Sequence, residues 1–257
     1  MKLSEKMILA GWVINKNEDD TFIVYGPNNQ KYSYDPSAKI WSGDAVDLEK
    51  EVDEDLEIIK QGKRSPITSS SRLTALNHTK QSSQPVRYIC SKRLVEGKTV
   101  LHLGTGLDRF AKRDLLASGC LEVADYDPNF YPDSSVLKKK YDVVMAHYIL
   151  NIIPPKVRHQ VYQLIGRTLN TEGIVYLTVQ GVWPVVNKYE IIRPLDDGYL
   201  IKTGYNQTFR KGYESADIVN EIQQELGGQA KVLTMFYSNT FISWSRERNH
   251  SVLNDKV

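Results

Sequence analysis

The sequence predicts an α/β protein, with a mostly parallel sheet in the larger C-terminal part of the chain and a small β-rich module before it. Three observations predict this. Strand-like and helix-like segments alternate between residues 85 and 179. A Gly-x-Gly turn, Gly104–Gly106, follows the first of these strands and precedes a helix. A Ser-rich, basic stretch at residues 61–72 separates the two patterns and predicts a linker.

Composition narrows the class of protein. The chain has 257 residues, 25% charged and 41% hydrophobic, with a net charge of +2. The composition is ordinary for a soluble globular protein. The small net charge of the whole chain gives no electrostatic reason to expect a nucleic-acid partner. Cys90 and Cys120 lie in no C-x-x-C pattern, so neither a metal centre nor a disulfide framework is indicated. Apolar runs are too short for a signal peptide or a membrane span, so we expect a cytoplasmic protein.

Residues 1–60 predict a small β-barrel-like module. A further strand is expected over Asp44–Leu48, and residues 41–46 resemble the Gly-Asp turn into a strand of small OB-fold and SH3-like barrels. Residues 44–57 are rich in Asp and Glu, which would repel nucleic acid if exposed on a binding face. Polar turns separate the earlier strand-like runs, which are Ile8–Ile14, Thr21–Tyr25 and Lys31–Tyr34.

Residues 73–245 predict the parallel sheet, and residues 246–257 a polar tail. The segment between Asp127 and Tyr141 is too short for another full strand and helix. The expected strands are Thr99–Leu103, Leu121–Tyr126, Tyr141–Ala146 and Ile174–Val179, followed by a closing hairpin of Lys231–Tyr237 and Thr240–Trp244. The expected helices are Pro85–Leu94, Arg109–Ser118, Pro155–Leu169 and Ser215–Leu226.

The glycine turn and a downstream acid are the first candidate for chemistry. Gly104 and Gly106 would let the backbone turn sharply and approach a ligand, while the next helix offers free N–H groups. Asp127 follows about 20 residues later at the end of the next strand, where an acid receives ribose hydroxyls in nucleotide-binding folds. Without a ligand, the same residues would form a tight turn and an Asp-Pro turn. Their combination favours the ligand interpretation.

Three segments resemble class I S-adenosylmethionine (SAM)-dependent methyltransferases. Residues 100–106, Val-Leu-His-Leu-Gly-Thr-Gly, are similar to the nucleotide loop of that family. Residues 141–154 resemble its fourth strand and following loop, and residues 169–177 its turn into the fifth strand. The resemblance implies a Rossmann-like sheet and SAM as cofactor. His102 stands where many relatives carry an acid, and a third glycine is absent. The cofactor-binding residues that it implies are Leu103, Gly104, Thr105, Gly106, Tyr126, Asp127 and His147.

A narrower resemblance concerns the acceptor. Residues 126–132 and 148–153, with the lead-in at 74–80, are similar to bacterial and phage methyltransferase-like proteins associated with DNA modification. The resemblance implies DNA or RNA as a partner. The insertion from Lys188 to Tyr213 mixes basic and aromatic residues, which suits bases stacking beside phosphates. An ordinary solvated face would have the same composition.

The leading functional hypothesis is therefore a SAM-dependent methyltransferase acting on nucleic acid, with the N-terminal module contacting substrate or a protein partner. His147, Tyr148 and Asn151 would face the methyl group, and His147 could serve as a base or simply pack at a strand end. No residue is assigned as catalytic, since methyl transfer depends chiefly on alignment. The alternative is a non-catalytic binding or regulatory protein with the same fold, such as a phage factor. A nicotinamide oxidoreductase is disfavoured because the third glycine is missing.

Overall fold

The chain folds into two compact units in this computed structural model, which describes residues 1–27, 30–43, 48–61, 71–75, 78 and 80–246. The N-terminal unit comprises residues 1–75, 152–154 and 189–210. The sheet unit comprises residues 76–151 and 155–188 and the chain from Lys211 onward. Most of the predicted linker and tail lies outside the described residues. No described helix is long and apolar enough to cross a membrane.

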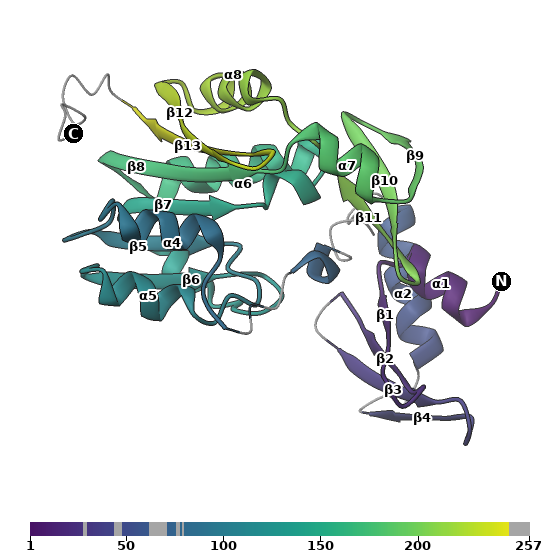
Figure 1. Cartoon of the computed structure of the whole chain (residues 1–257). Helices are drawn as coiled ribbons and strands as arrows, with labels where there is room; N and C mark the ends of the chain where they lie inside the picture. The colour runs from purple at the N-terminus through teal and green to yellow at the C-terminus, as the bar shows by residue number, and fades with distance from the viewer. Residues whose placement is uncertain (28–29, 44–47, 62–70, 76–77, 79, 247–257) are drawn as a thin grey trace. The chain divides into compact units, whose positions relative to one another are not determined.

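The sheet unit is built on one six-stranded sheet with the order β12-β13-β8-β7-β5-β6 (Figure 1). Strands β8, β7, β5 and β6 are parallel, and β13 pairs antiparallel with β8 and β12. The prediction of a mostly parallel sheet with a closing hairpin is confirmed. The strands are β5 (Thr99–Leu103), β6 (Glu122–Tyr126), β7 (Tyr141–His147), β8 (Leu169–Val179), β12 (Gln229–Phe236) and β13 (Asn239–Ser245).

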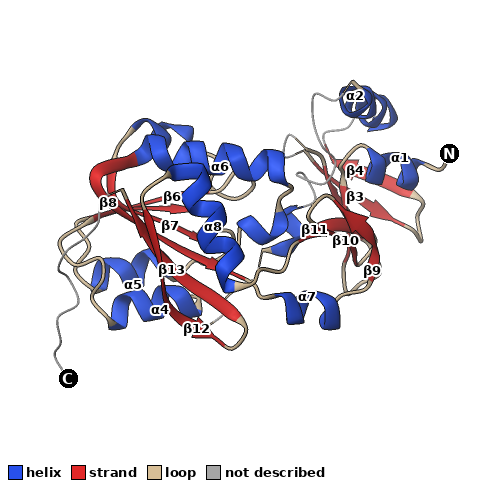
Figure 2. Cartoon of the chain, turned by 90° about the horizontal axis from the view of Figure 1, so that it is seen from above, coloured by secondary structure: helices blue, strands red, loops and turns tan. Residues whose placement is uncertain are grey.

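Helices cover both faces of this sheet (Figure 2). Strand β7 is buried along nearly its whole length, as expected of a parallel strand between two helical layers. Between β6 and β7 the chain forms only the short 3-10 helix η2 (Ser134–Lys138), so β6 is an edge strand. On one face lie α4 (Gln84–Ser91) and α5 (Ala111–Ala117), and on the other α6 (Pro155–Thr168) and α8 (Ser215–Leu226). The short elements η3 (Leu150–Ile152) and α7 (Val182–Lys188) complete the unit.

The N-terminal unit combines two antiparallel sheets that are distant in sequence. One is the meander β1 (Val13–Lys16), β2 (Phe22–Tyr25), β3 (Lys31–Asp35) and β4 (Ile40–Gly43), with helices α1 (Leu3–Leu9) and α2 (Leu48–Lys60). The other is β9 (Ile191–Leu195), β10 (Gly198–Thr203) and β11 (Asn206–Arg210), from the predicted insertion. The Asn206 side chain joins them, because it accepts from Ile14 N–H at 3.1 Å and donates to Ile14 O at 2.9 Å.

Two expectations for this unit need correction. Of the strand predicted over Ile8–Ile14, only Val13 and Ile14 lie in β1, while Ile8 and Leu9 belong to α1. Leu3, Met7 and Ala10 recur at helical spacing and join one apolar cluster with Val52 and Leu56 of α2. The expected barrel is not confirmed, since β1 and β4 are the two edges of a four-stranded meander among the described residues. Of the strand predicted over Asp44–Leu48, the first four residues lie outside the described part, and Leu48 begins α2.

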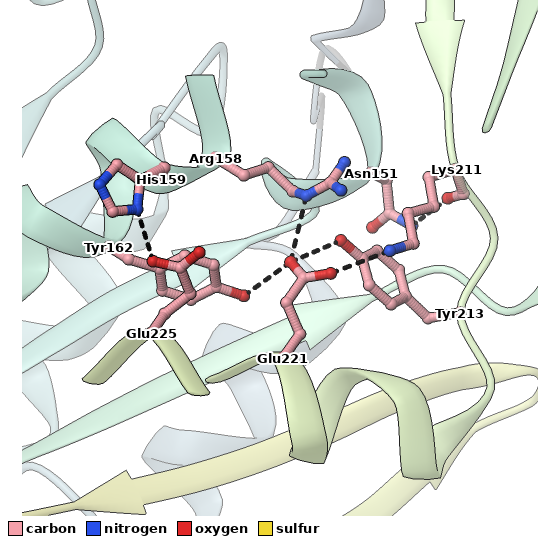
Figure 3. Close-up of polar contacts among 8 residues, drawn as sticks. All are labelled: Asn151, Arg158, His159, Tyr162, Lys211, Tyr213, Glu221 and Glu225. Atoms are coloured by element: carbon pink, nitrogen blue, oxygen red, sulfur yellow. Dashed lines mark hydrogen bonds and ion pairs between the residues drawn. The ribbon is translucent and has the colours of Figure 1, made fainter. Parts of the chain in front are cut away.

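A buried cluster around Glu221 of α8 joins the two helices on one face of the sheet (Figure 3). The Glu221 carboxylate accepts from Arg158 Nε at 3.1 Å and from Lys211 Nζ at 2.9 Å. It also accepts from the hydroxyls of Tyr162 at 3.0 Å and Tyr213 at 3.1 Å. The Arg158, Lys211 and Glu221 side chains are only 5%, 14% and 19% exposed, so salt screens these ion pairs weakly.

We predict that Glu221→Gln lowers the free energy of unfolding by about 3–5 kcal/mol, since it leaves two buried cations without their carboxylate. Urea unfolding of the whole chain measures this. Glu225→Gln, on the same helix, is the matched control, because Glu225 pairs with His159, whose side chain is 56% exposed. That loss should stay below about 1 kcal/mol. Equal losses in the two variants would contradict the structural weight given to Glu221.

Candidate functional site

The turn after β5 takes a backbone shape that favours glycine. Gly104 and Gly106 have φ values of +66° and +58°, in the left-handed region. A Cβ at Gly104 would also lie 2.8 Å from Cγ2 of Ile149, in the loop after β7. Gly104 N–H donates to Tyr126 O at 2.8 Å, and Leu103 pairs with Tyr126 in the β5-β6 register. The turn is therefore held close to both neighbouring strand ends.

Asp127 ties this turn to the end of β6. Its Oδ2 accepts from Gly106 N–H at 3.1 Å, and its Oδ1 accepts from the N–H groups of Asn129 at 2.8 Å and Phe130 at 3.2 Å. The residue is 8% exposed. The structure thus brings Gly106 and Asp127 together, and the carboxylate also stabilises the Asp-Pro turn that the sequence offered as the ligand-free alternative.

A neutral imidazole lies beneath the turn, at the position where the resemblance led us to expect an acid. His102 is 3% exposed, and its Nδ1 lies 3.8 Å from Asp125 Oδ1. Burial lowers the pKa of His102, although the carboxylates of Asp125, Asp108 and Asp127 act in the opposite direction. Thr105 Oγ1 lies 2.9 Å from His102 O and 3.2 Å from Asp125 Oδ1. Three carboxylates therefore surround an uncharged ring beside the glycine turn.

A second buried imidazole ends β7. His147 Nδ1 lies 2.9 Å from Thr178 Oγ1 on β8, and the His147 ring centroid lies 5.9 Å from that of His102. Burial lowers the pKa of His147 well below its ordinary value of 6.5, and the neighbouring His102 acts in the same direction. His147 is therefore neutral near pH 7, as a general base must be.

In the loop after β7, Tyr148 has a strained backbone and the Asn151 side chain bonds to two other segments of the sheet unit. Tyr148 has a φ of +61°, which is rare for an aromatic residue, and its N–H donates to Thr178 O at 2.7 Å. Burial raises the pKa of Tyr148 to about 12. Asn151 is fully buried, and its amide bonds to Gln180 N–H, Gln180 O and Lys211 O. The amide of Asn151 is therefore engaged inside the fold, and its placement beside a methyl group stays a prediction.

Several buried polar atoms at this edge of the sheet have no hydrogen-bond partner among the described residues. They include His102 Nδ1, Asp108 Oδ1, His147 Nε2 and Gln180 Oε1. Buried polar atoms are usually paired, so such a group indicates a place for a polar ligand. The strand order reverses between β5 and β7, which is where open α/β sheets bind ligands at the carboxyl ends of their strands.

Sequence reasoning missed Asp108 and Gln180. Asp108 offered a signal, since it occupies the loop position where a third glycine was sought, and its Oδ2 accepts from Ser83 N–H at 2.7 Å. A cavity of about 630 Å³ beside edge strand β6 is also lined by Asp108, together with Arg109, Val123, Phe130 and Tyr131. That volume suits a small molecule. Within the described ranges, no cluster of His, Cys, Asp and Glu could hold a metal ion.

The predicted basic and aromatic patch does not form one free surface. Lys202 pairs with Glu190, Lys211 pairs with the buried Glu221, and Arg210 lies over the ring of Tyr189. Lys188 lies 5.8 Å from the ring centroid of Trp183. These residues are also divided between the two units. Contact with nucleic acid through this insertion stays a prediction.

No family model matches the sequence, and no curated protein matches it. Among solved structures, the chain is similar to Burkholderia thailandensis 1,6-didemethyltoxoflavin-N1-methyltransferase with bound S-adenosylhomocysteine, at 12% identity over 91% of this chain and 99% of that one, with a TM-score of 0.44. A Bacteroides fragilis SAM-dependent methyltransferase in complex with S-adenosylhomocysteine is 12% identical over 66% of this chain and 80% of its own, with a TM-score of 0.45. The PH0226 protein of Pyrococcus horikoshii is 11% identical over 63% of this chain and 89% of its own, with a TM-score of 0.47. The function is therefore argued from the geometry of the chain itself.

We predict that His147 makes the fold acid-sensitive. Its pKa is lowered in the folded chain, so below pH 6.5 the unfolded chain gains a proton that the folded chain does not. Stability should be full above that pH and fall below it by about 1.4 kcal/mol per pH unit.

The measurement is urea unfolding at neutral pH and about two pH units lower. His147→Gln should make the dependence shallower, leaving the part that His102 contributes, while Thr178→Val, which keeps the imidazole, should retain the full slope. A His147→Gln profile as steep as that of the unaltered chain would contradict the assignment.

Proposed function

We propose that the chain binds SAM at the carboxyl edge of β5, β6 and β7 and transfers its methyl group. One observation carries the proposal: the left-handed Gly104–Gly106 turn is joined to the Asp127 carboxylate at the point where the strand order reverses. The resemblance of residues 100–106 to the nucleotide loop of SAM-dependent methyltransferases suggested this ligand, and the residues of the edge fit it.

Asp127 still has a free hydrogen-bond acceptor site that the ribose of SAM could use. A carboxylate has about four acceptor sites, and three backbone N–H groups already use three of them. Among the described residues, Oδ2 accepts only from Gly106, so a ribose hydroxyl would bond to Oδ2, next to the glycine turn. The base would extend toward the cavity beside β6, where Phe130 and Tyr131 offer aromatic surface.

Charge favours SAM over a nicotinamide dinucleotide. The Asp108, Asp125 and Asp127 carboxylates all act electrostatically on His102 and so lie around it. A sulfonium and an ammonium group are attracted by such surroundings, whereas a pyrophosphate is repelled. SAM supplies an electrophilic methyl group when bound. The chain's own contribution is then alignment, exclusion of water, and a neutral imidazole at His147 that could accept a proton from the acceptor.

Two parts of the functional hypothesis stay predictions. A nucleic-acid acceptor rests on composition and on the narrower resemblance. It is weakened because Lys211 pairs with the largely buried Glu221 and Lys202 forms a surface ion pair with Glu190. The non-catalytic alternative keeps the same ligand site without turnover. Incubation with labelled SAM and single- or double-stranded DNA or RNA at low salt tests both. Ligand binding with no methyl transfer to any acceptor would favour the non-catalytic alternative.

We predict that Gly106→Val abolishes binding of S-adenosylhomocysteine, because a side chain beside the turn would block the ligand and strain the backbone. Isothermal titration calorimetry measures this. Gly97→Val is the matched control, since Gly97 has a similar φ of +66° but nothing within 4 Å of an added Cβ. The Gly97→Val variant therefore has a similar backbone strain, but at a position away from the proposed ligand site. Unchanged affinity in a folded Gly106→Val protein would place the ligand elsewhere.

A further inference from the structure

A second candidate site centres on Arg210, the last residue of β11. Its Nε is buried and has no hydrogen-bond partner in the part of the chain that the structure describes. The unpartnered atoms of the proposed SAM site, such as His102 Nδ1 and Asp108 Oδ1, belong to the sheet unit. Arg210 belongs to the N-terminal unit.

The neighbours of Arg210 are aromatic rather than acidic. The guanidinium carbon lies 5.0 Å from the ring centroid of Tyr189, and Arg210 pairs with Tyr199 across the β10-β11 ladder. Gly198 permits the close approach of these strands, because a Cβ there would lie 2.5 Å from Arg210 O. Among the described residues, no carboxylate forms an ion pair with Arg210.

Arg210 as a whole is half-buried, and the buried Nε is the donor of its guanidinium that this arrangement leaves without an acceptor. A guanidinium has five N–H donors, and a cation–π contact attracts the charge without accepting a hydrogen bond. Burial lowers the pKa of Arg210, but a guanidinium stays protonated at neutral pH. Buried charges in native proteins are normally paired, and an acceptor that carries negative charge would both take the Nε–H hydrogen bond and compensate the charge.

We propose that Arg210, together with Tyr189, forms a binding site for an oxyanion, namely the phosphate or carboxylate group of a small ligand. Nε and a neighbouring Nη form one edge of the guanidinium fork, which matches two oxygens of such a group. A small ligand fits better than a polyanion, because the donor is buried. The cations nearby are also engaged, Lys202 with Glu190 and Arg193 with Pro194 O, so a nucleic-acid backbone would find few free partners. The site does not depend on SAM binding.

The test is titration of the full chain with inorganic phosphate at constant ionic strength, followed through the Arg Nε–H resonances by NMR. Arg210→Lys identifies the Arg210 signal by its disappearance. The proposal expects a saturable shift of that signal, which the matched variant Arg193→Gln should preserve, since Arg193 is exposed on β9 of the same unit. Absence of a saturable shift overturns the proposal.

Thermal unfolding gives an independent readout. Phosphate at roughly five times its Kd should raise the Tm of the unaltered chain and of Arg193→Gln by about 2–4 °C. Arg210→Gln should lose this response. Arg210→Lys keeps the positive charge but loses the paired N–H donors of the guanidinium, so it should bind phosphate roughly ten- to a hundredfold more weakly. This variant replaces Arg210→Gln in the test if Arg210→Gln does not fold. An equal phosphate response in the Arg210 variants would overturn the proposal.

A parallel titration with acetate separates the two sources of the oxyanion. Tighter phosphate binding indicates a phosphorylated ligand, and tighter acetate binding indicates a carboxylate-bearing one; both support the site. A response of Arg210 to an oligonucleotide, with none to phosphate or acetate, would overturn the small-ligand proposal in favour of a nucleic-acid surface. Calorimetry with S-adenosylhomocysteine on Arg210→Gln should show unchanged affinity, which keeps the two proposals separable.

Discussion

The bond between the Asp127 carboxylate and the amide of Gly106 is the constraint on which the proposed site depends. It joins two chain segments 21 residues apart, each at the end of a parallel strand. Backbone N–H groups in a left-handed turn need an acceptor, and a buried carboxylate needs donors, so each satisfies the other. The shape of the turn, the path of the chain after β6 and the position of the acid are therefore fixed by one group of bonds.

At the same carboxyl edge of the sheet, the loops after β7 and β8 are held by side-chain amide and ion-pair contacts. Asn151 bonds to the backbone at Gln180 and Lys211, and Lys211 then reaches Glu221 among Arg158 and two tyrosines. This cluster holds the point where the chain re-enters the sheet unit after the β9-β11 insertion. A large insertion can be tolerated there because its return is anchored by buried, mutually satisfied polar groups. The carboxyl edge of the sheet can then keep its shape although a long insertion leaves the sheet unit and returns to it there.

The sheet and the turn could be predicted from sequence because their signals are local. Strands β5 and β7 are mostly apolar, and Gly104, Gly106 and Asp127 stand at recognisable sequence distances from them. Helix α1 was missed because a short apolar run fits helix and strand alike until its neighbour α2 is known. The joining of Asn206 to Ile14 could not be predicted, since no local pattern encodes a contact between residues 192 positions apart. Asp108, Gln180 and Glu221 were missed for a related reason, because only tertiary neighbours show whether a polar residue is buried and what it bonds.

Local charge, rather than net charge, distinguishes the two proposed sites. The chain as a whole carries only +2, which excluded little. At His102, however, three carboxylates act electrostatically on a neutral ring, while at Arg210 a half-buried cation has aromatic neighbours and no described acid. Interactions between charges strengthen where water is excluded, so each site selects its ligand by sign before shape contributes. An acidic edge suits a cationic cofactor, and an unpaired guanidinium suits an oxyanion. The same physical rule therefore separates the two ligands within one nearly neutral chain.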